Sequence, residues 1–201
     1  MKIIPHLVIE PRMLFQHGSL KRRLKEIASD LSGDHDRLYV ADADGILKNK
    51  PQLDIVQTIC DEIPTMYEGG VRYSHNVIDM LITGAETAVV GTGTLVGLEE
   101  LGGAFKLSEN ITFKVDFRDG IVSSDPSIAG RALPDLFRDV AEIGIDEVIV
   151  PRTIAEEASS AASRHGLKLG VFASPSELGE LEPLGIDYAI SDDSRSVAED
   201  E

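Results

Sequence analysis

The stretch from Leu38 to Leu95 decides the fold expected for this chain, because it holds short apolar runs that end in polar or glycine-rich residues. These ends read Asp42-Ala43-Asp44-Gly45, Glu68-Gly69-Gly70-Val71-Arg72 and Gly91-Thr92-Gly93-Thr94. In a parallel α/β barrel, the residues that carry out chemistry follow the carboxyl ends of the strands. The stretch therefore predicts part of such a barrel, with its strand ends gathered at one mouth.

The same alternation extends over the whole sequence, where short β-branched runs and helical patterns follow one another, as is typical of a parallel sheet built from βα units. We expect eight strands, the number that closes a barrel, at residues 2–9, 37–41, 65–67, 87–90, 111–115, 147–150, 168–172 and 187–190. No Pro, Gly and Ser rich linker interrupts the pattern, so residues 1–201 are predicted to form a single (βα)8 TIM-barrel domain. The alternative is a flavodoxin-like open sheet.

The last part of the chain is short for a barrel of this class. Beyond the eighth expected strand only residues 194–201 follow, and they are polar and acidic. We therefore expect a stunted last helix. This leaves open a homo-oligomer in which a second subunit covers the seam between the first and last strands.

The composition excludes some partners. The chain has 35 acidic and 19 basic residues and a formal charge of −16, whereas nucleic-acid binding requires a basic stripe that this sequence lacks. It has no apolar run of signal-peptide length or of the roughly 20 residues that span a membrane, and its one cysteine, Cys60, cannot form an intrachain disulfide. We expect an acidic cytoplasmic protein with no nucleic-acid partner and no membrane partner.

Charged residues at the end of the fifth strand are candidates for catalysis. Asp116 ends this strand, where a carboxylate facing the mouth can act as general acid or base. The alternative is a capping or ion-paired aspartate in a turn. Lys114 lies two residues earlier, on the same side of the strand. We expect this lysine either to pair with an acidic neighbour such as Asp42 or to be a functional amine of lowered pKa.

The second strand ends in two aspartates, Asp42 and Asp44, whose spacing of two predicts that both lie on one face. Two carboxylates can share a proton or help to bind a metal ion, but two ligands are too few to specify a metal site. We keep Asp42 as a further catalytic candidate, and we expect neither a metal nor another cofactor.

Glycine-rich turns follow the third and fourth strands, which are neighbours in a barrel. The backbone NH groups of Gly69-Gly70 and Gly91-Thr92 can converge on one phosphate, with a hydroxyl from Thr92 or Thr94 and with Arg72 nearby. The alternative is a pair of ordinary tight turns. The loops after the seventh and eighth strands lack such glycines, and Asp192-Asp193 repels a phosphate there. The predicted partner is therefore a small metabolite with one phosphate.

Taken in order, these motifs resemble the HisA/HisF family of histidine-biosynthesis barrels, and its HisA branch, the ProFAR isomerases, more closely. The similar segments cover nearly the whole chain and are Met1 to Pro5, Val40 to Gly45, Gly69 to Arg72, Val90 to Thr92 and Asp116 to Val122. The resemblance implies the same barrel and a reaction that opens the ring of a phosphorylated aminoaldose and rearranges it to an aminoketose. In the family, one aspartate on the first strand and one on the fifth exchange acid and base roles.

The chain also departs from the family pattern. Asp116 matches the fifth-strand aspartate, but Val8 stands at the first-strand position and cannot transfer a proton; Glu10 is the carboxylate nearest to it. Glu68 replaces the first glycine of the third-strand motif, and Asp192-Asp193 replaces the usual Gly-Arg after the eighth strand. The segment between the first and second strands is shorter than in the isomerase, which removes material that would close over a long substrate.

These departures favour a divergent HisA-like isomerase or lyase that acts on a small monophosphorylated metabolite and lacks authentic ProFAR isomerase activity. In this hypothesis Asp116 is the acid or base, and Lys114 adds an amine if the chemistry passes through a Schiff base. The alternative is a non-catalytic barrel that binds a phosphorylated ligand or a partner protein.

Overall fold

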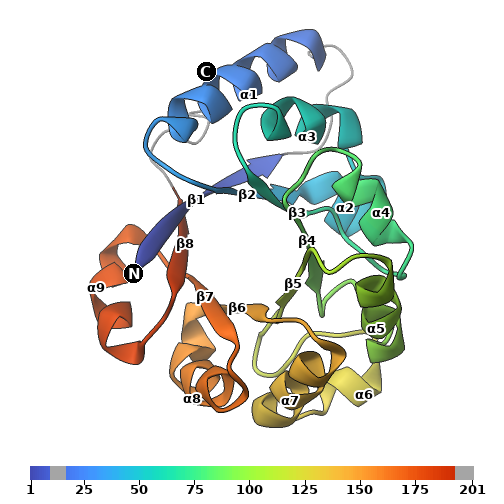
Figure 1. Ribbon diagram of the computed structural model, residues 1–201, viewed down its shortest axis with the longest axis vertical. Helices are drawn as coiled ribbons and strands as arrows, with labels where there is room; N and C mark the ends of the chain where they lie inside the picture. The colour runs from blue at the N-terminus through green and yellow to red at the C-terminus, as the bar shows by residue number, and fades with distance from the viewer. Residues whose placement is uncertain (10–16, 193–201) are drawn as a thin grey trace.

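The computed structural model describes the backbone of residues 1–9 and 17–192, and its strands form a closed barrel in chain order (Figure 1). Each neighbouring pair is parallel, and the pairing of Lys2 with Tyr188 joins the last strand to the first. The TIM-barrel prediction is confirmed, and the open-sheet alternative is wrong because this pairing closes the sheet. The strands are β1 (Lys2–Ile9), β2 (Leu38–Asp42), β3 (Thr65–Glu68), β4 (Thr87–Gly91), β5 (Ile111–Lys114), β6 (Glu147–Pro151), β7 (Lys168–Phe172) and β8 (Tyr188–Asp192).

Helices lie around the outside of the barrel (Figure 1). They are α1 (His17–Ser32), α2 (Ala43–Lys48), α3 (Leu53–Cys60), α4 (Asn76–Leu81), α5 (Leu98–Leu107), α6 (Pro126–Ala129), α7 (Leu133–Ile143), α8 (Ala155–His165) and α9 (Leu178–Leu181), with 3-10 turns at Arg152–Ile154, Pro175–Glu177 and Glu182–Leu184. The predictions of a shortened first loop and a stunted last helix fall on residues outside the described ranges. Within those ranges, no helix combines the length and the apolar character needed to cross a membrane.

Side-chain alternation along the strands decides what each residue faces. One cluster of buried side chains fills the barrel interior, and it consists of Ile4, Tyr39, Met66, Val89, Ile149, Tyr188 and Ile190. The intervening residues, such as Leu38 and Val40, pack with the helices instead. Glu68 therefore points into the barrel, two residues after Met66, whereas Asp42 continues the helix-facing row of Val40.

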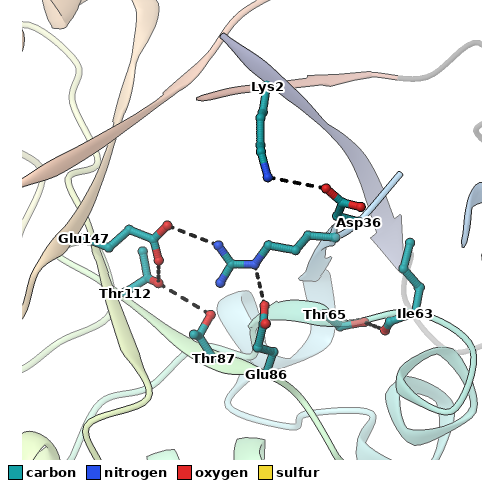
Figure 2. A network of polar contacts seen from close by, with 9 residues as sticks. Lys2, Asp36, Ile63, Thr65, Glu86, Thr87, Thr112 and Glu147 are labelled. Carbon is teal, nitrogen blue, oxygen red and sulfur yellow. Dashed lines mark hydrogen bonds and ion pairs between the residues drawn. The ribbon is translucent and has the colours of Figure 1, made fainter. Parts of the chain in front are cut away.

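A polar network closes the amino-terminal end of the barrel (Figure 2). The Arg37 guanidinium pairs with Glu86 and lies 3.2 Å from Glu147 Oε1. The Thr112 hydroxyl donates to Glu147 Oε2 at 2.8 Å. A cavity of about 1020 Å³ opens beside this network. Because features at this end of a TIM barrel serve stability and those at the opposite end serve chemistry, we place the candidate site at the other mouth.

Candidate active site at the barrel mouth

Lys114 joins two carboxylates inside the carboxyl-terminal mouth of the barrel. Its Nζ atom lies 2.6 Å from Glu68 Oε1 and 2.7 Å from Asp116 Oδ1. The exposed fraction of the side chain is 15% for Lys114, 6% for Glu68 and 28% for Asp116. The ammonium therefore bridges the ends of β3 and β5, and Asp116 is the carboxylate that a molecule in the mouth can reach.

The surroundings of Lys114 hold it in the charged form. Burial lowers the pKa of this lysine, but the nearby charges of Glu68 and Asp116 outweigh burial and raise the pKa above its ordinary value. The expectation of an ion pair is confirmed, but its partners are Glu68 and Asp116, not Asp42. The alternative of an amine with lowered pKa is wrong, because two carboxylates at hydrogen-bond distance stabilise the ammonium.

Glu68 is held from its other side by a buried tyrosine. The Tyr39 hydroxyl donates to Glu68 Oε2 at 2.7 Å. Burial and then the charge of Glu68 raise the pKa of Tyr39 well above its ordinary value, so the hydroxyl keeps its proton and remains a donor. The rings of His6 and Phe172 pack edge-on against Tyr39, with centroids 5.5 and 5.0 Å away. Glu68 thus has a fixed position, with one oxygen for each donor.

Asp116 is fixed by the turn that follows β4. Its Oδ2 accepts a hydrogen bond from the Gly93 NH at 2.9 Å, and its own NH donates to Thr92 Oγ1 at 2.9 Å. Gly91 leaves room beside it: a methyl group on Gly91 would lie 2.9 Å from Asp116 Oδ2 and 3.4 Å from Glu68 Oε1. The space at Gly91 therefore borders both carboxylates.

The glycines after β3 are required by close packing. A methyl group on Gly69 would lie 2.1 Å from Met80 Sδ, and one on Gly70 would lie 2.3 Å from the Gly45 carbonyl oxygen. Gly70 also has φ +76°, a conformation that favours glycine. The Gly69 contact is with α4, whereas the Gly70 contact brings the β3–α4 turn directly against Gly45 of α2.

A family model described as histidine biosynthesis protein matches residues 16–157, which is more than half of the chain. The chain belongs to this family. One curated relative, a phosphoribosyl imidazole-4-carboxamide isomerase of Chloroflexus aggregans, is 33% identical over 95 residues, covering 44% of this chain and 39% of the relative. The isomerase of the same name from Paraburkholderia phymatum is 28% identical over 168 residues, covering 74% of this chain and 66% of the relative.

The matches extend over only part of the relatives. The isomerase of the same name from Burkholderia vietnamiensis is 28% identical over 123 residues, and the match covers 48% of that protein's length. The chain thus spans about half the length of the curated relatives it matches. The predicted resemblance to the family is confirmed. Whether this chain has the activity of these longer relatives is a matter for proposal.

Two residues predicted to bind phosphate have structural contacts in this member of the family. Arg72 donates to the carbonyl oxygens of Gly45, Ile46 and Gly70 at 3.2, 2.8 and 2.7 Å and to Asn49 Oδ1 at 3.1 Å. These bonds tie the β3–α4 turn to α2. Thr92 is fully buried, and its hydroxyl accepts from the Asp116 NH. Neither side chain is directed at an open site, and the Thr92 NH donates to the Lys114 carbonyl oxygen at 2.9 Å. A phosphate contact through the NH groups of Gly69, Gly70 and Gly91 stays a prediction.

Asp42 lies on the helix side of β2, away from the mouth. It is fully buried, and it accepts hydrogen bonds from the NH groups of Asp44 and Gly45 at the start of α2 and from the Tyr67 hydroxyl at 2.9 Å. Asp44 is the first-turn residue of that helix and pairs with Lys48. The expected common strand face of the two aspartates is therefore wrong, because the chain turns into α2 directly after Asp42. The structure gives Asp42 a capping position.

The first strand brings an apolar residue to the mouth. Val8 is paired with Ala41 at the end of the barrel, and 42% of its surface is exposed. This is the position at which the resemblance places an aspartate in other family members. Glu10, Asp193 and the side chain of Asp192 lie outside what the structure describes. In the described residues, no group of three or more His, Cys, Asp or Glu is arranged to hold a metal ion.

Glu68 is a member of the site that sequence reasoning missed, because in the sequence it stands out only as a departure from the family's glycine. The alternation of side chains along a strand could have found it: Glu68 lies two residues after Met66, at the end of an apolar strand, and therefore on the same face. The prediction that Asp116 ends the fifth strand is wrong, because β5 ends at Lys114. The Val115 NH still donates to the Ile149 carbonyl oxygen at 2.8 Å, and the contact between Lys114 and Asp116 shows that the two side chains lie on one side as expected.

Proposed function

We propose that this protein is an acid–base isomerase or lyase that acts on a small metabolite with one phosphate, and that its substrate differs from that of the curated relatives. The observation that carries the proposal is the position of Asp116. Its carboxylate is accessible at the mouth and is fixed by the Gly93 NH at 2.9 Å and by Lys114 at 2.7 Å. A positioned carboxylate of this kind suits general acid–base catalysis.

The chemistry needs one proton acceptor and a carbonyl substrate. Asp116 takes a proton from the carbon beside the carbonyl group, and the electron pair left on that carbon forms the double bond of an enediol or enol. The carbonyl oxygen gains a proton from water. In an isomerase, Asp116 then returns its proton to the former carbonyl carbon, while the other hydroxyl of the enediol gives its proton to the hydroxide left from water and becomes the new carbonyl. In a lyase, the enol gives its O–H proton to that hydroxide and the carbonyl re-forms; the C=C electron pair moves to form a double bond to the next carbon, and the leaving group departs from that carbon with its bonding pair. Neither course requires a redox partner.

One phosphate is proposed to bind at the turns after β3 and β4. These strands are adjacent in the barrel, which brings the turn containing Gly69 and Gly70 beside the turn containing Gly91 and Thr92. The contacts would come from the main-chain NH groups of Gly69, Gly70 and Gly91, since the Arg72 and Thr92 side chains and the Thr92 NH are bonded elsewhere. With two carboxylates and one lysine nearby, the mouth does not favour a second phosphate.

Deuterium exchange tests the proposal even where the product is unidentified. The protein is incubated with a panel of aldose and ketose monophosphates in D₂O, and ¹H NMR follows loss of the signal from the hydrogen beside the carbonyl. We expect exchange with at least one compound, and a loss of about 100-fold or more in Asp116→Asn. Asp146→Asn is the control, because Asp146 is 71% exposed in a pair with Lys168. Exchange that persists in Asp116→Asn would reject the role of Asp116.

The apolar Val8 at the first-strand position favours a second candidate, a barrel that binds a phosphorylated ligand or a partner protein without catalysis. Binding of panel compounds with no exchange by any of them would select this candidate. A separate test uses a histidine auxotroph that lacks the ProFAR isomerase. Our proposal expects no growth rescue by this protein, and rescue would show that it has the relatives' activity.

A further inference from the structure

A single ammonium group serves both carboxylates of the mouth. Lys114 Nζ lies at almost equal distances from Glu68 Oε1 and Asp116 Oδ1, 2.6 and 2.7 Å. The two carboxylates differ in access, because Glu68 is nearly buried whereas Asp116 is partly exposed. Only Asp116 is placed to touch a substrate, so Glu68 requires another role.

The contacts of Glu68 hold its carboxylate and the Lys114 ammonium in fixed positions. One of its oxygens accepts from the Tyr39 hydroxyl at 2.7 Å and the other from Lys114. If Glu68 were neutral, the ammonium would have Asp116 as its one close anion. The full attraction would then act on Asp116, and the carboxylate would release its proton more readily and be a weaker base.

We propose that Glu68 is a positioning residue for Asp116, which acts through the ammonium that the two carboxylates share: it fixes Lys114 between β3 and β5 and offsets part of its charge, so that Asp116 is not the one anion on which this ammonium acts. This inference rests on the proposed function for its catalytic meaning. The electrostatic coupling itself is a property of the protein without substrate, and it can be measured separately.

The described titratable groups around Asp116 are few enough to interpret a titration. Lys114, at the end of β5, lies two residues before Asp116; Glu68 approaches from β3, and Tyr39 on β2 interacts with Asp116 through charge. His6 on β1 is one ring further away, against Tyr39. Removing the charge of Glu68 removes a like charge near Asp116 and also leaves Lys114 to Asp116 alone. Both effects stabilise the ionised form of Asp116, so they act in the same direction.

Carbon-13 NMR of labelled aspartate carboxyl groups tests the coupling, with the Asp116 signal assigned by its absence in Asp116→Asn. In Glu68→Gln we expect the titration midpoint of Asp116 to fall by about one pH unit. Glu68→Asp, which keeps the charge, should return the midpoint toward the wild-type value. Glu86→Gln removes the same charge at the opposite end of the barrel, next to Arg37, and should leave the midpoint unchanged. A midpoint that is unchanged or higher in Glu68→Gln would overturn the proposal.

A second measurement needs no variant and covers the case in which Glu68→Gln does not fold. In the wild-type protein, scalar couplings across the hydrogen bonds of the Lys114 ¹⁵Nζ group should reach the carboxyl carbons of both Glu68 and Asp116. Coupling to Asp116 alone would overturn the shared ammonium. Where an exchanging compound is found, the acid limb of its pH profile should move to lower pH in Glu68→Gln. If titration and couplings agree with expectation but no compound exchanges, the proposed function fails and the coupling stands.

Discussion

Replacing Lys114 by methionine removes the cation that holds the mouth together, and it should destabilise the fold. Methionine keeps most of the volume of the lysine stem, so the change chiefly deletes the charge. Glu68, with 6% of its side chain exposed, would then face Asp116 with no cation between them. Breaking a buried ion pair by removing one partner typically costs about 3–5 kcal/mol, because the remaining charge is left uncompensated.

The structure places the expected cost near the lower end of that range. Asp116 is 28% exposed and keeps its bond from the Gly93 NH, and Tyr39 still donates to Glu68. We therefore expect Lys114→Met to lower the free energy of unfolding by about 3 kcal/mol at pH 7. For a chain of this size, that corresponds to a fall in Tm of roughly 6–12 °C.

The pH dependence gives the prediction a sign. The folded-state pKa of Lys114 is raised, so the stabilisation from its ion pairs is fully present below the unfolded pKa of about 10.4 and is lost only as the pH rises through the folded value. At pH 7 the wild-type protein therefore has the full stabilisation from the Lys114 ion pairs. In Lys114→Met, Glu68 and Asp116 face each other with no cation between them, so a proton bound by either carboxylate relieves their repulsion. Protonation then favours the folded variant, so its deficit should shrink as the pH falls from 7 toward about 4.5.

Urea unfolding at pH 7 and pH 5 measures both effects, with Lys168→Met as the matched control. Lys168 and its partner Asp146 are 60% and 71% exposed, so that variant should change stability by no more than about 0.5 kcal/mol. The reasoning is refuted if Lys114→Met and Lys168→Met unfold at the same urea concentration at pH 7. It is also refuted if the deficit of Lys114→Met grows on acidification.

Three further variants separate packing from chemistry. Arg72→Ala removes four side-chain hydrogen bonds, three of which join the β3–α4 turn to α2 and its C-cap, so the free energy of unfolding should fall by about 2–4 kcal/mol in urea. Arg138→Ala, on the exposed face of α7, should keep the wild-type midpoint. Asp42→Ala leaves buried donors without an acceptor, and the same measurement should show a loss of about 3–5 kcal/mol; a loss below about 1 kcal/mol would contradict its capping position. Gly91→Ala places a methyl group 2.9 Å from Asp116 Oδ2, so the deuterium-exchange rate should fall about tenfold or more with little change in the urea midpoint. An unchanged exchange rate would show that the position of the Asp116 carboxylate is unimportant.

Much of the fold was predictable because its signals are local. The eight expected strands agree with the observed bounds to within two residues, and the alternation of apolar and polar residues placed Lys114 and Asp116 on one side of β5. The same alternation failed at Asp44, since the strand ends at Asp42 and a helix begins at Ala43. The alternation predicts direction only while the chain stays paired with its neighbouring strand: it still holds at Asp116, two residues beyond β5, where the Val115 NH donates to the Ile149 carbonyl oxygen.

The sequence by itself determined the barrel, the mouth at which its polar strand ends gather and the family to which the chain is similar. Only the tertiary structure decided which groups meet there. Glu68 and Lys114 are 46 positions apart, and their contact depends on β3 and β5 both turning these side chains into the barrel on either side of Gly91. Likewise, Arg72 donates hydrogen bonds to α2 because the glycines at 45 and 70 allow the start of α2 and the β3–α4 turn to come into contact. Local patterns fix elements and faces, whereas partners are fixed by close packing between segments distant in sequence.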